Sequence, residues 1–521
     1  MRCFVGTLHI AMGDEETELK LALTPRTFAK LAQDPLLGEA QAGARPLAAV
    51  YFDTRRHALW RRGVSLRLRR ERGRWMQTLK GGGSLEAGLH RRIEIAQRAA
   101  GDAPDLGLLG DSELERLAVR AARGAPLVAV FRVAVERDTR LLHPAPGVTI
   151  EASLDRGTIL AGKSRLPVCE VEFELKRGPA SSLFDLALAL AARHPVRLEH
   201  RSKAERGYVL AGAVRPAPVR GRLDAIRREM SPSQAFTAAC LACLNHLQAN
   251  QHGVIRGENP EYLHQARVAM RRLRSVLDAF KTLAPRAMIE PRAKSVRQLT
   301  RALGPARDWD VFAAQTLGPV VAQFPGHRGL MALVRASARL GDEANRSARR
   351  ALAARRAQAL QLELGGWLAA QPWLAADSDK AQRAWQAPVR EHVGSVLERY
   401  HRRALKRGRR IGSASLPRLH RLRIATKKLR YAAGFFGPLY ARNRVKPMLV
   451  ALNELQDVLG AINDCACAPA LIEAASAAAR GPLRQQARTI ISHWNAAMLE
   501  ERRGALKRAW KKLCTCERFW R

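Results

Sequence analysis

Glu16-Thr17-Glu18-Leu19-Lys20 is the stretch that decides how the first part of this chain folds. In a β-strand alternate side chains share a face, so Glu16, Glu18 and Lys20 would point the same way. Two carboxylates and an ammonium group do not suit a dry core, because burying unpaired charge is costly. They suit a polar cavity in which carboxylates hold metal ions and a cation holds an anionic substrate.

Later segments repeat this alternation and carry both signs of charge. Arg67 and Arg69 share a strand face, with Leu66 and Leu68 opposite. One such strand is typical of any amphipathic sheet in water, but many together favour a sheet closed into a barrel, with a charged lumen and helices over its apolar outside. Besides the Glu16 strand, the predicted strands are 47–53, 64–70, 75–80, 90–96, 128–137, 149–155 and 168–176, with breaks that include Gly81-Gly82-Gly83, and the predicted helices are 27–33, 111–123 and 183–193.

Length and charge divide the chain into two parts. A chain of 521 residues predicts two or three domains, and its net charge of +42 indicates a polyanionic partner. Residues 222–521 hold 53 basic and 22 acidic residues (53 − 22 = +31), which leaves 36 basic and 25 acidic residues, or +11, for residues 1–221. The first part therefore mixes both signs, while the second is strongly cationic.

The second part is predicted to be all-α. Residues 211–221 contain Pro and Gly and are a candidate linker, and beyond them the strand patterns disappear. The predicted helices are 223–251, 262–282, 291–303, 308–322, 334–360, 383–408, 416–436, 446–459 and 482–514.

This helical part contains an internal repeat. The segment from His264 to Arg274 matches the segment from His420 to Arg430 at an offset of 420 − 264 = 156 residues. A second match, between Asp308 and Asp464 in the sequences Leu-Gly-Pro-Ala-Arg-Asp and Leu-Gly-Ala-Ile-Asn-Asp, has the same offset, 464 − 308 = 156. Two matches at one offset indicate duplicated helical halves.

Each repeat places a histidine-led row of cations on one helix face. The two rows are His264, Arg267, Arg271 and Arg274, and His420, Arg423, Lys427 and Arg430. A single row is typical of a solvated surface, but two duplicated rows without acidic partners favour a groove for a linear polyanion. Nucleic acid is disfavoured as that partner, because aromatic residues make up only 5% of the chain and none lies in the rows to stack on bases.

The remaining composition limits the other classes of function. The close cysteine pairs lie in helical or loop segments without a zinc pattern, so we expect free or buried thiols and a reducing compartment. No segment resembles a secretory signal or a run of ~20 apolar residues, which predicts a cytoplasmic protein without a membrane partner. No Ser-His-Asp, P-loop or nucleophilic cysteine pattern occurs, so metal-assisted attack by water on a phosphate is the expected chemistry.

Residues 12–210 resemble a CYTH domain, the triphosphate tunnel metalloenzyme fold. Its ExExK motif matches Glu16, Glu18 and Lys20, with further matches at 65–69, 78–80, 90–94, 150–155, 169–174 and 202–208. Residues 222–515 resemble a CHAD domain, a duplicated helical bundle with histidine-led basic helices. We therefore expect an α+β tunnel domain of eight antiparallel strands over 1–210, a linker over 211–221 and an all-α domain over 222–515.

The resemblance implies a role for each charged residue of the tunnel. Phosphate would be bound by Lys20, Arg67, Arg69, Lys80, Arg92, Arg137 and Lys203. Mg²⁺ or Mn²⁺ would be held by Glu16, Glu18, Glu94, Asp155, Glu170 and Glu172. Glu16, Glu18, Lys20 and Lys80 would serve catalysis. The two cationic rows of the helical domain would bind polyphosphate.

The expected activity is hydrolysis of inorganic triphosphate, as in bacterial proteins of this layout. Two alternatives stay open: a tunnel enzyme for ATP or thiamine triphosphate, and a non-enzymatic protein that binds polyphosphate or its granules in the cytoplasm. Because such domains commonly begin a few residues before ExExK, Met12 is an alternative to Met1 as the initiator, and the sequence leaves this choice open.

Overall fold

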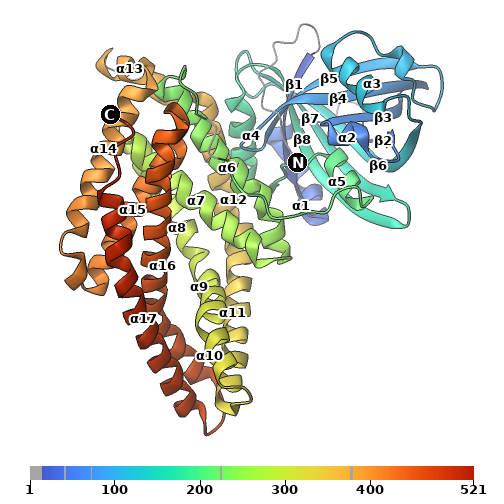
Figure 1. Cartoon of the computed structure of the whole chain (residues 1–521). Coiled ribbons are helices and arrows are strands. Elements are labelled where there is room, and N and C mark those ends of the chain that lie inside the picture. The colour runs from blue at the N-terminus through green and yellow to red at the C-terminus, as the bar shows by residue number, and fades with distance from the viewer. Residues whose placement is uncertain (1–13, 40–42, 72, 223–225, 376–378) are drawn as a thin grey trace. The chain divides into compact units, whose positions relative to one another are not determined.

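The computed structural model describes residues 14–39, 43–71, 73–222, 226–375 and 379–521, so the expectation about Met12 lies outside the described residues. The chain forms two compact units (Figure 1). One unit takes the chain up to Ala217 and adds Arg355–Gln371; the other consists of Pro218–Ala354 and Pro372–Arg521.

The first unit is a closed antiparallel barrel, as the alternation predicts. The strands pair in the order β5-β4-β3-β2-β6-β7-β8-β1, and β1 also pairs with β5, which closes the sheet. A short ninth strand, β9, adds to β1 at Leu21 and Ala22. The strands are β1 Asp14–Ala22, β2 Arg45–Thr54, β3 Val64–Glu71, β4 Arg74–Glu86, β5 Leu89–Ala99, β6 Leu127–Leu142, β7 Thr149–Ala161, β8 Ser164–Arg177 and β9 Arg197–Leu198.

Helices cover the apolar outside of this barrel. Leu66 and Leu68 of β3 are buried in one core cluster with Leu114 and Ala118 of α3, which confirms that the leucine face points outward. The helices of this unit are α1 Pro25–Leu31, α2 Ala58–Arg61, α3 Glu113–Ala122, α4 Ser181–Arg193, α5 Lys203–Leu210 and α12 Arg355–Ala370.

The glycines at 81–83 do not end a strand, so that prediction is wrong. Strand β4 continues through them with a shift of register against β5 between Gly81 and Ser84. Gly83 has φ +91°, and a Cβ there would lie 2.0 Å from the carbonyl oxygen of Arg91. The glycines therefore form a bulge in which the backbones of β4 and β5 approach closely.

Helix α12 belongs to the barrel unit although it lies far along the chain. The single helix predicted over 334–360 is two helices, because α11 ends at Ala353 and Ala354 is extended. Arg355 donates to the carbonyls of Ala191 and Ala192 at the end of α4, at 3.0 and 2.7 Å. Gln358 Oε1 accepts a hydrogen bond from the Leu198 N–H of β9 at 3.2 Å. The expected domain over 222–515 is thus interrupted in sequence by a barrel element.

The second unit is all-helical, as predicted. Its α-helices are α6 Pro232–Arg256, α7 Pro260–Phe280, α8 Arg286–Ala302, α9 Gly304–Phe312, α10 Gly318–Gln323, α11 Arg328–Ala353, α13 Asp379–Gln386, α14 Val389–Gly408, α15 Leu416–Phe436, α16 Arg442–Ala478 and α17 Arg484–Cys514. Helix α16 is longer than the predicted 446–459 and runs through Pro469. By length and composition it could cross a bilayer (mean hydropathy 1.3), a test that a core helix also passes. Leu452, Leu455 and Leu459 are buried in this unit.

The packing of α12 gives a first prediction. A Cβ at Gly365 of α12 would lie 2.4 Å from Cε1 of Phe184, so we expect Gly365→Ala to destabilise the barrel unit by about 1–3 kcal/mol. The matched change Gly504→Ala in α17 meets nothing within 4 Å and should cost no stability. Hydrogen exchange of the β1 and β8 amides across a denaturant series measures the effect, and equal exchange in the two variants would contradict the placement of α12.

Candidate functional site

Strand β1 carries its charges into the barrel. Leu19 and Leu21 are fully buried on the outer face, so the alternate residues Glu16, Glu18 and Lys20 face the lumen. Glu18 and Lys20 are nearly inaccessible to solvent, at 7% and 2% exposure. Strand pairing sets Glu16 opposite Arg92 of β5, and Lys20 opposite Glu172 of β8. The predicted triad is therefore in place, with charged neighbours on both sides.

One group of ion pairs is centred on Lys80 of β4. Its Nζ lies 2.5 Å from Glu16 Oε2 and 2.6 Å from Glu94 Oε2, and Glu94 also pairs with Arg67 at 3.1 Å. Burial alone would raise the pKa of Glu94, but Lys80 and Arg67 outweigh it and hold that pKa below its ordinary value. At Glu16 burial wins over Lys80 and the pKa is raised. The two carboxylates that share Lys80 thus have pKa values shifted in opposite directions.

A second group is centred on Lys203 of α5. Its Nζ lies 2.5 Å from Asp155 Oδ2, 2.5 Å from Glu170 Oε1 and 3.0 Å from Glu172 Oε1. Arg137 binds both oxygens of Asp155, at 2.7 and 2.6 Å, and reaches Glu172 at 2.7 Å. Burial would raise the pKa of Glu172, yet the nearby cations, with Lys20 the foremost, hold it well below its ordinary value. The Glu172 carboxylate is therefore ionised at neutral pH.

The same three carboxylates fit a metal ion. Asp155, Glu170 and Glu172 each offer an oxygen, and these oxygens lie within 4.8 Å of one another. Asp155 and Glu170 are fully buried, so they form a rigid, water-poor set of hard oxygen ligands of the kind that Mg²⁺ and Mn²⁺ prefer. A cation here would share the carboxylates with Lys203. Glu16, Glu18 and Glu94, the other predicted ligands, line the same lumen outside this set.

Two cations of the tunnel are less occupied by carboxylates. Arg69 pairs with Glu71 of its own strand, and the NH2 group of Arg92 donates to His90 Nδ1 at 3.0 Å. The Nε groups of Arg67 and Arg69 are buried without a hydrogen-bond partner among the described residues. Because an unmet buried donor is costly, these guanidinium groups favour an anionic ligand in the lumen. They lie where the sequence predicts phosphate binding.

Arg206 is a lumen residue that the sequence-based prediction missed. It is 7% exposed and its NH2 group lies 2.5 Å from Glu170 Oε2. Ser202 caps α5 by accepting from the Glu205 N–H, which places Lys203 and Arg206 one turn apart on the same face. Tyr208 then fixes the helix by donating its hydroxyl to buried Asp53 at 2.9 Å. The i,i+3 spacing of two cations is the signal that could have found Arg206.

The helical unit brings together half of the predicted cationic residues. Arg271 and Arg274 of α7 and Arg423 and Lys427 of α15 line one cavity of about 690 Å³. Burial, and then Arg423, Arg271 and Arg430, lower the pKa of Lys427 to about 6. Such a shift means that the positive charge lacks enough counter-charge in the protein.

The other four residues of the two rows do not line this cavity. Arg267 is 5% exposed and donates to the carbonyl of Leu303, so it has a structural contact inside the bundle. His420 Nδ1 lies 2.8 Å from Asn463 Oδ1, and Arg430 reaches Asn453 at 3.4 Å. Burial, and then Arg307, lower the pKa of His264. The rows therefore extend beyond the cavity, toward contacts with α9 and α16.

Both units match known domain families. The general class of this protein is defined by a closed barrel with a charged lumen and a duplicated helical unit. The CYTH domain family matches residues 14–208, and the CHAD domain family matches residues 238–473. The chain thus belongs to the proteins that carry a CYTH domain followed by a CHAD domain.

Individual relatives resemble one part or the other. An inorganic triphosphatase of Haemophilus influenzae is 31% identical over 205 residues, which cover 38% of this chain and 55% of that relative. The CHAD domain of the plant Ricinus communis is 30% identical, with a TM-score of 0.50, and covers 58% of this chain and 98% of its own. A protein from Hippeastrum with a dominant triphosphatase activity is 18% identical over 39% of this chain and 98% of its own, with a TM-score of 0.28, too weak a likeness to inform function.

The carboxylate set gives a prediction that does not depend on turnover. We expect Mn²⁺ to raise the melting temperature of the protein, with a stabilisation of about 2.7 kcal/mol at 100 times the dissociation constant. Asp155→Asn should abolish that shift, whereas Glu136→Gln, an exposed neighbour on β6, should retain it. The metal-induced shift in differential scanning fluorimetry is compared within each variant. An unchanged shift in Asp155→Asn would rule out this set as the metal site.

Proposed function

We propose that the barrel hydrolyses inorganic triphosphate in a metal-dependent reaction. The single observation that carries this proposal is the lumen itself, where six carboxylates and eight cations, Arg206 among them, converge in a buried tunnel. The 31% identity to an inorganic triphosphatase supports it, although the match spans 55% of that relative. The lumen supplies both kinds of group that a phosphoric anhydride and its metal ion need, because phosphate oxygens bind cations and metal ions bind carboxylates.

The residues would divide the work as follows. Arg67, Arg69 and Arg92 grip phosphate oxygens, with planar guanidinium groups suited to bidentate contacts. Asp155, Glu170 and Glu172 hold the divalent cation, which when bound neutralises phosphate charge and lowers the pKa of a water molecule. Glu16, whose pKa is raised by burial, is the carboxylate best suited to take a proton from the attacking water. Lys80 lies beside it and stabilises negative charge as the phosphate leaves.

Activity of a Glu18→Gln variant tests whether the tunnel is a catalytic site. We expect its rate on triphosphate with Mg²⁺ or Mn²⁺ to fall by about 10²-fold, because Glu18 is buried against Lys20 and its loss disturbs the charge balance of the lumen. Glu136→Gln, on the exposed side of β6, should keep the wild-type rate. Phosphate release is measured on triphosphate, ATP and thiamine triphosphate, since the lumen charges recognise phosphates and not the group attached to them. Equal release by wild type and Glu18→Gln would refute a catalytic tunnel and favour a binding protein.

We further propose that the cavity between α7 and α15 binds inorganic polyphosphate. Arg271, Arg274, Arg423 and Lys427 supply cations from both repeats, and the lowered pKa of Lys427 means that an anionic ligand would relieve their mutual repulsion. The lining also includes Tyr431 but no set of aromatic rings for stacking bases, so phosphate chains suit it better than nucleic acid. This second function does not require the first.

The lowered pKa predicts pH-dependent binding. Bound polyphosphate should raise the pKa of Lys427 from about 6, so binding takes up a proton above that pH and affinity falls as the pH rises from 6.5 to 8.5, by up to about tenfold per pH unit. The charged neighbours that set this pKa are Arg271, Arg423, Arg430 and Asp464. Lys427→Arg should bind with little pH dependence, while the matched Lys428→Arg, whose lysine pairs with Asp278 at 2.9 Å, should behave as wild type. Calorimetry in two buffers of different ionisation enthalpy counts the proton, and no uptake by wild type would contradict the prediction.

A further inference from the structure

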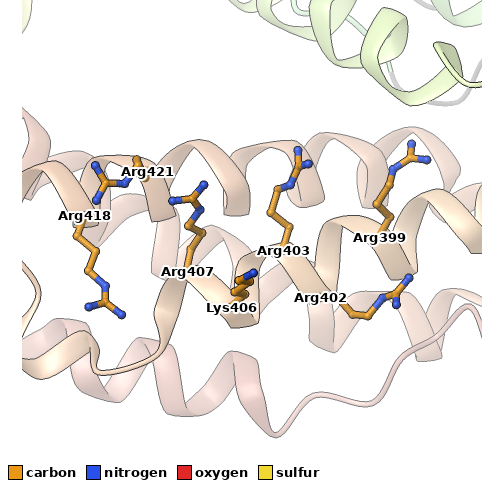
Figure 2. Close-up of a pocket in the computed structure, with 7 residues that line it drawn as sticks. All are labelled: Arg399, Arg402, Arg403, Lys406, Arg407, Arg418 and Arg421. Carbon is orange, nitrogen blue, oxygen red and sulfur yellow. The ribbon is translucent and has the colours of Figure 1, made fainter.

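A second cationic groove lies on the helical unit, between α14 and α15. It is a cavity of about 670 Å³ with a lining made only of basic residues: Arg399, Arg402, Arg403, Lys406, Arg407, Arg418 and Arg421 (Figure 2). Figure 2 shows Arg399, Arg403 and Arg407 extending from α14 in one direction. Their i, i+4, i+8 spacing forms a row of about 12 Å along the helix. No residue of this lining belongs to the two histidine-led rows.

The protein provides little counter-charge for this groove. Among the described residues, Arg402 is the groove cation with an acidic contact, to Glu398 at 3.9 Å, and Glu398 is also bound by Arg518 and Arg521. Arg418 donates to the carbonyl of Arg409 at 2.6 Å. Like charges one turn apart repel each other, so this arrangement lowers stability unless an anion occupies it.

Helix stabilisation does not account for the groove. Cations near the end of α14, such as Lys406 and Arg407, would interact favourably with the helix dipole. Arg399 lies more than two turns before the end of α14, too far for this effect. Arg418 lies in the first turn of α15, where a cation opposes the dipole. The first turn of α15 instead adds its own positive end to the groove, which favours an anion there.

The duplication shows that the groove belongs to one repeat. Helix α6, the counterpart of α14, contains no lysine or arginine before its last residue, Arg256. Arg418 and Arg421 correspond to Tyr262 (418 − 156) and Gln265 (421 − 156), which are 4% and 7% exposed. The first repeat therefore buries the face that the second repeat exposes and fills with cations.

The groove is also separate from the cavity between α7 and α15. Arg421 and Arg423 are two residues apart on α15, so they point about 200° apart around the helix. Arg421 lines the groove and Arg423 lines the other cavity. The two cationic sites thus lie on opposite sides of one helix.

We propose that the α14–α15 groove is a second binding site for inorganic polyphosphate, found in the second repeat alone. Six guanidinium groups match the closely spaced oxyanions of a phosphate chain. The lining has no aromatic ring and no amide side chain, so it offers a nucleic acid neither base stacking nor base-specific hydrogen bonds. The proposal shares its ligand class with the α7–α15 cavity but rests on different residues, and a long chain held at both sites would bind with avidity.

Polyphosphate binding by three full-length variants tests this proposal. The groove variant is Arg403→Ala/Arg407→Ala/Arg421→Ala, and the cavity variant is Arg271→Ala/Arg423→Ala/Lys427→Ala. The control is Arg328→Ala/Arg335→Ala/Arg346→Ala, which removes three exposed cations of α11 and loses the same net charge. Affinity for long-chain polyphosphate is measured against salt concentration, with triphosphate in excess to occupy the tunnel, and circular dichroism verifies folding.

We expect the groove variant to bind at least tenfold more weakly than the control. Its slope of log K against log salt concentration should also be smaller in magnitude by about 2–3, because fewer counterions are released. Groove and control variants of equal affinity would overturn the proposal. So would a groove variant that loses single-stranded RNA binding and keeps polyphosphate binding. Loss of polyphosphate binding in the cavity variant alone would support binding in the α7–α15 cavity and contradict this inference. Loss in the groove variant alone would support the α14–α15 groove and contradict polyphosphate binding in the α7–α15 cavity.

Discussion

The balance of buried charge around Lys203 is the constraint on which the barrel unit depends. One ammonium group lies within 3.0 Å of three carboxylates, two of them fully buried, so removing it would leave those carboxylates with too little positive charge to balance them, although Arg137 and Arg206 also bind them. Lys203 comes from α5, outside the strand order, and its position relies on the Ser202 cap and on the Tyr208–Asp53 hydrogen bond. Strand β9, just before α5, pairs with β1, and the N–H of its Leu198 donates a hydrogen bond to Gln358 of α12. A distant helix thus supports the charge balance of the lumen.

The two units balance their positive charge in opposite ways. In the tunnel nearly every cation already has a carboxylate, so a ligand anion enters a balanced network and a divalent cation can compensate for it. In the helical unit burial, and then repulsion from Arg423 and Arg271, lower the pKa of Lys427, and a ligand anion would itself supply the counter-charge. The first arrangement suits a defined substrate held in a fixed geometry. The second suits a polyanion of variable length.

Alternation of charged and apolar residues was sufficient to predict the barrel, because a strand's period of two separates lumen from outside whatever the exact ends. It predicted that Glu16, Glu18 and Lys20 share one face of the strand, and the burial of Leu19 and Leu21 on the other face agrees with this. Strand alternation could not reveal Arg206, which lies on α5, where the i,i+3 spacing from Lys203 is the relevant signal. The break at Ala354 depends on helix packing, because no Gly or Pro marks the start of α12. The glycines of β4 and Pro469 of α16 were the reverse case, where a local break signal was overridden by strand pairing and by packing of the bundle.

The two repeats of the helical unit show how duplication left room for a second site. In the first repeat, Asn250 of α6 exchanges hydrogen bonds with the N–H and carbonyl of Val219, at 3.0 and 2.9 Å, and Arg272 of α7 binds the carbonyl of Gly221 at 2.8 Å. The entering chain therefore covers this side of α6 and α7, which explains why buried uncharged residues stand there. In the second repeat the chain enters α14 from helix α13, with only Ala387 and Pro388 between the two helices. Its equivalent face stays open to solvent, and an open face can carry the cations that a covered one cannot.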